Sequence, residues 1–302
     1  MSDNLAVEGR QEQVALGISL MLGAYLLFSF IDAGAKWLAL LGLPSTQLAF
    51  MRYAPHFLVS SAIIVRTHKL SSLTSSHAPM LIFRGSLLMG STILNFFAVR
   101  YLPLTLTSTI LFSAPLMACM LSQPMLAEKV GLFRWTAVLF GFAGVIIAIR
   151  PFDESFHWAA LLSLGGAFCF ALYALLTRKY AGRVSTDVMQ FYSGAVGTIC
   201  LLPFAILSWQ NPVSATDWVI MVSLGIFGWA GHQLLTQAHR FAATSILMPF
   251  GYSFILFLTI WSYLIFDHLP DRWTLIGGSI VVLSGLFIWF RETRILPDRQ
   301  TR

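Results

Sequence analysis

Two charged pairs interrupt stretches of this sequence that are otherwise apolar. Asp32 and Lys36 lie four residues apart, as do Arg52 and His56, so each pair would share one face of a helix. Arg52 and His56 together predict either a wall that binds an anionic or polar ligand, or an arginine that bonds to helix carbonyls or reaches toward the membrane interface. Asp32 and Lys36 predict either a structural ion pair or a group that takes up a proton in step with ligand binding.

Uncharged polar and aromatic side chains extend this set. His232 and Gln233 belong to a polar helical face that cannot point at an apolar environment, and Asn95 has the same standing. Tyr173 and Tyr252 predict either stacking on a flat ligand or simple packing, which is the default for a lone aromatic. The candidate binding residues are therefore Arg52, His56, Asn95, Tyr173, His232, Gln233 and Tyr252.

Catalytic, metal-binding and redox patterns find little support in the sequence. The three cysteines lie in apolar runs without metal or redox spacing. Only His232 with His239 approaches a catalytic cluster, and no acid lies near them. There is no nucleotide-binding loop, and the net charge of +6 is carried by short polar segments rather than by a nucleic-acid-binding patch. We expect no catalytic residues, no cofactor, no metal and no nucleic acid partner.

Composition indicates that the elements positioning these residues are membrane helices. Of the 302 residues, 57% are hydrophobic and 11% are charged, whereas a soluble domain has roughly a quarter charged residues. About 20 apolar residues cross a bilayer as a helix. Ten such stretches follow one another: 14–35, 46–65, 80–99, 105–126, 135–149, 158–177, 188–207, 218–237, 245–266 and 273–290.

Lysine and arginine positions predict how these spans are oriented. The two termini and the segments after spans 2, 4, 6 and 8 hold thirteen basic residues, and the opposite segments hold four. The positive-inside rule then puts both termini in the cytoplasm. Arg84 lies near the cytoplasmic end of span 3, where we expect it to reach toward the lipid headgroups. Pro115 and Pro249 predict breaks in spans 4 and 9, and recurrent glycines predict close helix packing.

The two halves of the chain carry similar patterns in the same order. An acidic residue ends the fourth span of each half, Glu128 and Asp267, and an Arg-Trp pair and a Gly-containing span follow each. An odd number of spans per half inverts the second copy, as in many secondary carriers. We expect a cytoplasmic tail at 1–13, five-span units at 14–151 and 152–290, and a second cytoplasmic tail at 291–302.

Several segments resemble the drug/metabolite transporter superfamily, EamA type, in order along nearly the whole chain. They are 83–87 (FRGSL), 95–98 (NFFA), 113–115 (SAP), 141–144 (GFAG), 248–252 (MPFGY), 266–270 (FDHLP) and 284–286 (SGL). The resemblance implies an all-α carrier with ten helices, built from two inverted five-helix units. Residues 27–38 are similar to a bacterial branch that includes riboflavin and S-adenosylmethionine carriers. Where other members have a proline in span 9, this chain has Phe254.

These observations favour a secondary transporter of a small organic metabolite in the bacterial inner membrane. Riboflavin or a similar flat heterocycle is the preferred substrate, because of the span 1 resemblance and the two tyrosines. An amino-acid exporter and an S-adenosylmethionine transporter of the same superfamily stay open, as do import and export. A membrane-embedded enzyme lacks a catalytic cluster, and an ion channel lacks a repeated filter loop or rings of charge.

Overall fold

The computed structural model is built from helices, with no β-strand among the residues that it describes. These are residues 2–67, 77–126, 131–180, 183–242 and 244–294. The helices of the first half are α1 (Ser2–Leu40), α2 (Ser45–Thr67), α3 (Ala78–Tyr101), α4 (Leu104–Leu111), α5 (Ala114–Leu126) and α6 (Leu132–Ile149). Those of the second half are α7 (Ala159–Tyr180), α8 (Thr186–Leu207), α9 (Ala215–Phe241), α10 (Thr244–Leu247), the 3₁₀ helix η2 (Met248–Tyr252), α11 (Ser253–Phe266) and α12 (Arg272–Arg294).

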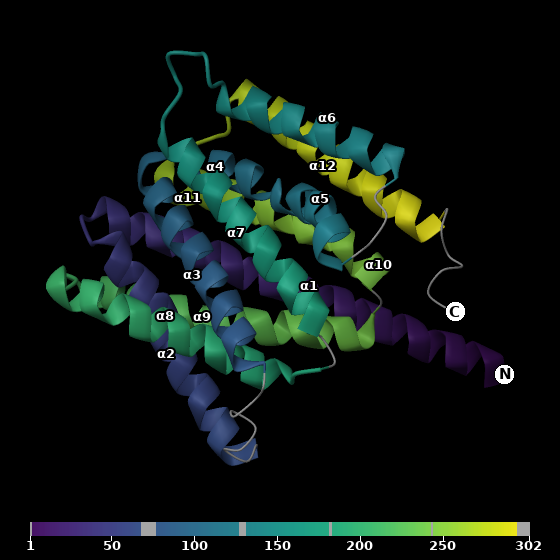
Figure 1. Ribbon diagram of the computed structural model, residues 1–302, viewed down its shortest axis with the longest axis horizontal. Helices are drawn as coiled ribbons and strands as arrows, with labels where there is room; N and C mark the ends of the chain where they lie inside the picture. The colour runs from purple at the N-terminus through teal and green to yellow at the C-terminus, as the bar shows by residue number, and fades with distance from the viewer. Residues whose placement is uncertain (1, 68–76, 127–130, 181–182, 243, 295–302) are drawn as a thin grey trace.

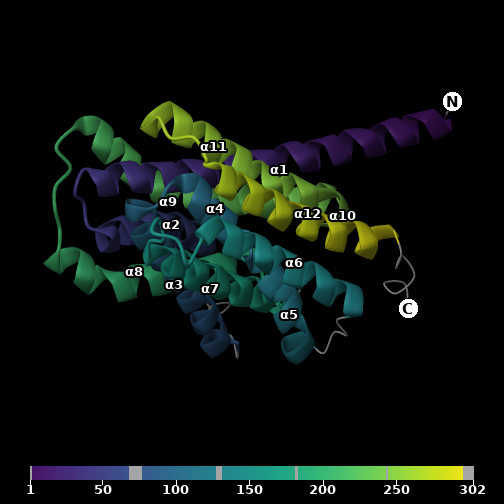
Figure 2. The ribbon, with the colours of Figure 1, turned by 90° about the horizontal axis from the view of Figure 1, so that it is seen from above.

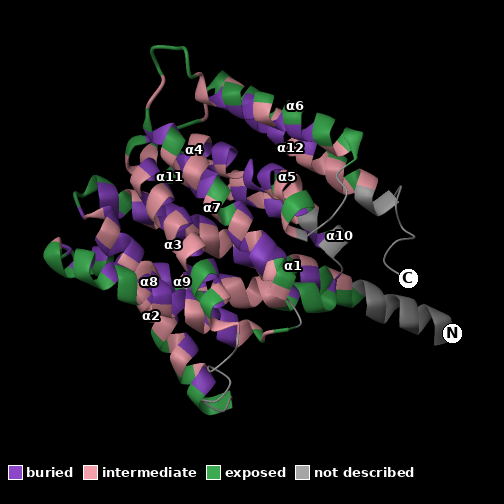
Figure 3. Cartoon of the chain, in the orientation of Figure 1, coloured by how far each residue is buried: buried purple, intermediate pink, exposed green. Residues whose placement is uncertain are grey.

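Ten helical segments are long and apolar enough to cross a membrane, which confirms the ten predicted spans. Helices suit this setting because each satisfies its own backbone hydrogen bonds where no water is present. Large apolar side chains such as Phe140 and Leu264 are exposed, where lipid would cover them. Figure 3 shows exposed residues along the outside of helices such as α6. The predicted tail at 1–13 continues α1 as helix from Ser2, and residues 295–302 of the second tail lie outside the described part.

Two of the ten spans are interrupted, as the prolines predicted. Span 4 divides into α4 and α5 at Phe112 and Ser113, and Pro115 lies in the first turn of α5, where its missing N–H cannot bond back to α4. Span 9 divides into α10, η2 and α11, with Pro249 in the 3₁₀ turn. The two interruptions meet, because the ring of Phe112 stacks on that of Tyr252 with centroids 5.2 Å apart.

The helices pair between the two halves of the sequence. The most extensive contacts are α1 with α9, α3 with α7, α2 with α8 and α6 with α12, and α4 contacts α11. Figure 1 shows α6 and α12 running side by side, and the first turn of α1 and the last turns of α12 lie at the same end of the bundle in both views (Figures 1 and 2). The largest core cluster fills the space between α1, α2, α3, α7, α8 and α9.

Glycines bring backbones together where these pairs cross, as predicted. Gly144 of α6 and Gly277 of α12 face each other so closely that a Cβ on either would collide with the other's carbonyl oxygen. A Cβ at Gly285 would collide with the hydroxyl of Tyr252, so this glycine of α12 makes room for the interrupted span 9. The interrupted span is therefore held against its neighbour by shape.

Candidate functional site

Asp32, Asn95 and Arg52 form one end of a polar site inside the bundle. The Asn95 side-chain amide on α3 donates a hydrogen bond of 3.1 Å to Asp32 Oδ2 on α1, and both side chains are buried. Arg52 on α2 lies near enough to Asp32 to attract it electrostatically. Its guanidinium carbon is 5.7 Å from the centre of the Phe96 ring, and it makes no hydrogen bond or ion pair within the described residues. Arg52 is thus a half-buried cation whose hydrogen-bond donors are unpaired within the described residues.

His56 and His232 continue the site one turn further along α2. Their ring centroids are 6.2 Å apart, and Phe28 of α1 packs edge-on to His232 at 5.0 Å. His56 Nε2 is buried without a hydrogen-bond partner in the described part of the chain. Gln190 of α8 lies beside His56 and interacts with it, although no pair of their atoms meets hydrogen-bond geometry. The structure therefore brings together Asp32, Arg52, His56, Asn95 and His232.

Gln233 and Tyr252 lie at the margins of this group. Gln233 follows His232 on α9 and is half-buried, with no hydrogen bond to any described residue. Tyr252 stacks on Phe112, and its hydroxyl lies against Gly285. One face of the tyrosine ring is therefore occupied by the protein itself.

The structure contradicts the expectation that Arg84 reaches toward the lipid headgroups. It is only 4% exposed and lies between α3, α7 and α8. Its guanidinium donates to Thr177 Oγ1 at 2.7 Å, the Met189 carbonyl at 3.1 Å, Ser193 Oγ at 3.0 Å and the Tyr173 hydroxyl at 2.8 Å. It also lies 4.3 Å from the centre of the Tyr173 ring.

The same contacts involve Tyr173. Its hydroxyl and one ring face are engaged by Arg84, and Phe170 stacks beside it with centroids 5.8 Å apart. Tyr173 as a residue that lines the binding site stays a prediction. Arg84 satisfies its donors with protein groups instead of with lipid headgroups, because four acceptors from α7 and α8 surround it.

The predicted ion pair between Asp32 and Lys36 is not formed. The Lys36 ammonium donates to the Leu102 carbonyl at 2.5 Å and lies 5.4 Å from the centre of the Phe266 ring. Each side chain bonds to a different group instead: Asp32 accepts from Asn95 on α3, and Lys36 donates to the Leu102 carbonyl just after α3. Asp32 as a proton-coupling group stays a prediction.

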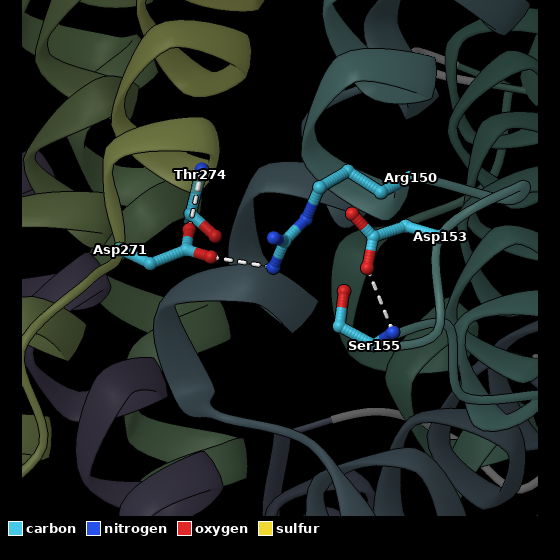
Figure 4. A network of polar contacts seen from close by, with 5 residues as sticks. All are labelled: Arg150, Asp153, Ser155, Asp271 and Thr274. Atoms are coloured by element: carbon cyan, nitrogen blue, oxygen red, sulfur yellow. Dashed lines mark hydrogen bonds and ion pairs between the residues drawn. The ribbon is translucent and has the colours of Figure 1, made fainter.

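An ion pair joins the two halves outside the membrane-spanning segments. Arg150, just after α6, donates to Asp271 Oδ2 at 2.6 Å, and Asp271 caps the first turn of α12 by accepting from the Thr274 amide (Figure 4). Partial burial raises the pKa of Asp271, but the Thr274 hydrogen bonds and the Arg150 and Arg272 charges outweigh it and leave the pKa below its usual value. Hydrogen bonds from Ser155 lower the pKa of Asp153.

Metal and redox chemistry gain no support from the arrangement. Among the described residues, no group of three or more His, Cys, Asp or Glu side chains lies close enough to hold a metal ion. The three cysteines, Cys119, Cys169 and Cys200, are not in disulfides. Glu128, which the sequence places at the end of span 4, lies outside the described residues.

Sequence reasoning missed three residues that contact the site. Gln190 is not among the predicted candidates because it lies near the end of predicted span 7, and Phe28 and Phe96 are apolar residues in apolar runs. Phe28 had a signal, since it precedes Asp32 by one helical turn and shares its face. Gln190 also had one, since Gly194 and Gly197 mark the same face of its helix as closely packed.

A bundle of membrane-crossing helices that buries charged and hydrogen-bonding side chains, with two crossings interrupted inside it, is the architecture of a membrane transporter. The chain belongs to the EamA-like transporter family, whose model matches residues 15–150 and again residues 157–290. This confirms the resemblance found in the sequence.

Named relatives cover nearly the whole chain. A riboflavin transporter of Vibrio cholerae is 30% identical over 280 residues, covering 92% of this chain and 94% of that protein. An S-adenosylmethionine uptake transporter of Rickettsia bellii is 28% identical over 285 residues, covering 94% and 97%. A solved crystal structure with 17% identity covers 91% of this chain and 98% of its own with a TM-score of 0.61, and it supports the fold alone. The chain is thus a multi-pass protein of the bacterial inner membrane.

Proposed function

We propose that this chain is a secondary transporter that carries a small organic metabolite across the inner membrane by alternating access. In this proposal residues 14–151 and 152–290 are inverted repeats, and both tails are cytoplasmic. The pairing of helices supports it. In a repeat of five spans, α1 corresponds to α7 and α3 corresponds to α9, so the α1–α9 contact should recur as the α7–α3 contact, and both are present. The contacts α2–α8, α6–α12 and α4–α11 each join a helix to its own counterpart. A two-fold relation between the halves requires this pattern.

The proposed substrate is riboflavin or a similar flat heterocycle, taken up into the cell. The observation that carries it is the half-buried Arg52, whose donors have no partner among the described residues. The Phe96 ring lies beside it, and the Phe28 and His232 rings pack together one turn further along the site. Guanidinium donors suit ring carbonyls, and aromatic side chains suit a flat ring system. The riboflavin transporter of Vibrio cholerae, similar over nearly the full length, supports the same substrate.

Uptake into proteoliposomes tests this proposal. Purified protein should accumulate riboflavin with saturable kinetics, and unlabelled riboflavin should compete. Liposomes without protein should take up none. The Gln237→Met variant, changed at an exposed position of α9, should take up riboflavin like the wild type. Ion conductance that does not saturate, or no uptake by protein that is folded, would refute it.

A zwitterionic or cationic substrate is the second candidate, as in an S-adenosylmethionine or amino-acid transporter. The observation in its favour is the Asp32 carboxylate near the Arg52 guanidinium, since one could hold an ammonium or sulfonium group and the other a carboxylate. Asp32→Asn separates the two candidates. It should abolish uptake of a cationic substrate and leave uptake of an uncharged flavin measurable.

A further inference from the structure

Three polar side chains form a line along α2 that faces the interior. Arg52, His56 and Ser60 follow one another at intervals of four residues, so they share a face and extend over about 12 Å at 1.5 Å per residue. We call them, together with Gln190 of α8, the α2 polar line. The two ends of this line differ in chemistry, because Arg52 is a charged donor and the other members are neutral.

The register between α2 and α8 brings Gln190 to the neutral end. A Cβ at Gly197 would collide with the Tyr53 ring, and one at Gly194 would lie 3.0 Å from the Phe57 Cα. The two helices are thus antiparallel in contact, and moving four residues along α2 moves about three back along α8. The next step reaches Ser61 on α2 and about residue 191 on α8, which brings Gln190 to this part of α2, where it interacts with His56.

The neutral end is buried but unmatched. His56 and Ser60 are each 3% exposed, and Gln190 is 6% exposed. His56 Nε2, Ser60 Oγ and both amide atoms of Gln190 have no hydrogen-bond partner among the described residues. Native proteins pair nearly all buried polar groups, since an unmatched one loses its bonds to water and gains nothing. Four such atoms together point to a ligand that supplies the missing partners.

We propose that His56, Ser60 and Gln190 bind a polyol chain, such as the ribityl chain of riboflavin, while the ring of the same molecule lies at Arg52. The neutral groups match hydroxyls, because a serine hydroxyl, an amide and an imidazole each offer both donors and acceptors, as hydroxyls do. Arg52 only donates, so it matches ring carbonyls. At the Arg52 end the Phe96 ring centre is 5.7 Å from the guanidinium carbon, and it can pack against the flat ring. This inference rests on the proposed function and names its specificity-determining residues.

Binding of two flavins tests it. Riboflavin and lumiflavin share one ring system, but lumiflavin has a methyl group in place of the ribityl chain. Quenching of flavin fluorescence by the purified protein should give at least roughly tenfold tighter binding of riboflavin. Gln190→Met should weaken riboflavin binding by roughly tenfold, to near the lumiflavin level, and leave lumiflavin unchanged. Ser60→Ala should act in the same direction with a smaller factor.

Controls separate recognition from structure. Gln237→Met makes the same chemical change at an exposed position and should alter neither affinity. The melting temperature of Gln190→Met should stay the same or rise, because an unmatched buried amide is removed. Equal losses for both flavins, a lowered melting temperature, or wild-type protein that does not distinguish the flavins would each overturn the inference while leaving riboflavin transport intact. Wild-type protein that binds neither flavin would overturn the riboflavin proposal and this inference together.

Discussion

Two arginines inside the membrane part of this protein are treated in opposite ways. Arg84 on α3 is surrounded by α7 and α8 and donates four hydrogen bonds. Arg52 on α2 lies beside the Phe96 ring and attracts the Asp32 carboxylate, but its donors have no hydrogen-bond acceptor among the described residues. A charge in the membrane is costly, so a protein keeps it either by satisfying it internally or by reserving it for a ligand. Arg84 follows the first course, and we propose that Arg52 follows the second.

The largest expected effect is loss of stability at Arg84. Arg84→Met removes the guanidinium that donates to the hydroxyl oxygens of Tyr173, Thr177 and Ser193. These oxygens stay inside the bundle without that donor, so we expect a loss of at least about 3 kcal/mol in the free energy of unfolding. Thermal melting in detergent measures it. Arg84→Lys keeps the charge but not the planar guanidinium, so its free energy of unfolding should lie between those of the wild type and Arg84→Met. If Arg84→Met melted at the wild-type temperature, Arg84 would not have the structural role assigned to it.

Arg52 should show the reverse pattern, with a smaller energy. Arg52→Met leaves no protein acceptor unmatched, so we expect unfolding to change by less than about 1 kcal/mol. Binding of riboflavin should weaken by at least about tenfold, because a hydrogen bond to a charged group contributes roughly 1.5–3 kcal/mol. The same melting and fluorescence measurements decide this. If Arg52→Met melted as early as Arg84→Met, the two arginines would share a structural role.

Arg150 extends the comparison to an exposed arginine, where the effect is smallest. Asp271, its partner, is 43% exposed, so the pair should contribute below about 1 kcal/mol. Asp271→Asn keeps a side-chain oxygen to cap α12 and removes the charge. Because the folded pKa of Asp271 lies below its unfolded value, the stabilisation is complete above the unfolded pKa of about 3.9 and is lost as pH falls through the folded pKa.

This prediction has a clear form in a pH series. The difference in melting temperature between wild type and Asp271→Asn should be constant from neutral pH to about pH 5 and should shrink below about pH 4. High salt should reduce the difference at every pH. A difference that grew with acidification would contradict the assigned sign.

Much of the fold could be predicted from the sequence because lipid imposes simple rules. An apolar stretch of the right length must be a helix, and the ten predicted spans correspond to the ten long apolar helices. The breaks before Pro115 and at Pro249 were predicted from proline chemistry, which acts within one turn, although Pro55, Pro124 and Pro203 lie inside continuous helices. Both inferences use only residues that are close together in the chain.

The site was harder to predict because it depends on partners far apart in the chain. Helical spacing correctly put Asp32 and Lys36 on one face, but Asn95 and the Leu102 carbonyl compete for them, and no local pattern shows this. Arg84 is the same case, since its acceptors come from α7 and α8. Spacing identifies which polar groups face inward, and only the packed helices show which of them already have a partner.

The contact between Gly144 and Gly277 has a consequence at the level of the gene. Each glycine lies against the other's peptide group, one in each half of the chain, so a codon change at either position wedges the same two backbones apart. A second change at the other position cannot restore the fit, because glycine is already the smallest residue. Two distant places in the reading frame are therefore subject to a single constraint, and neither can drift to compensate for the other.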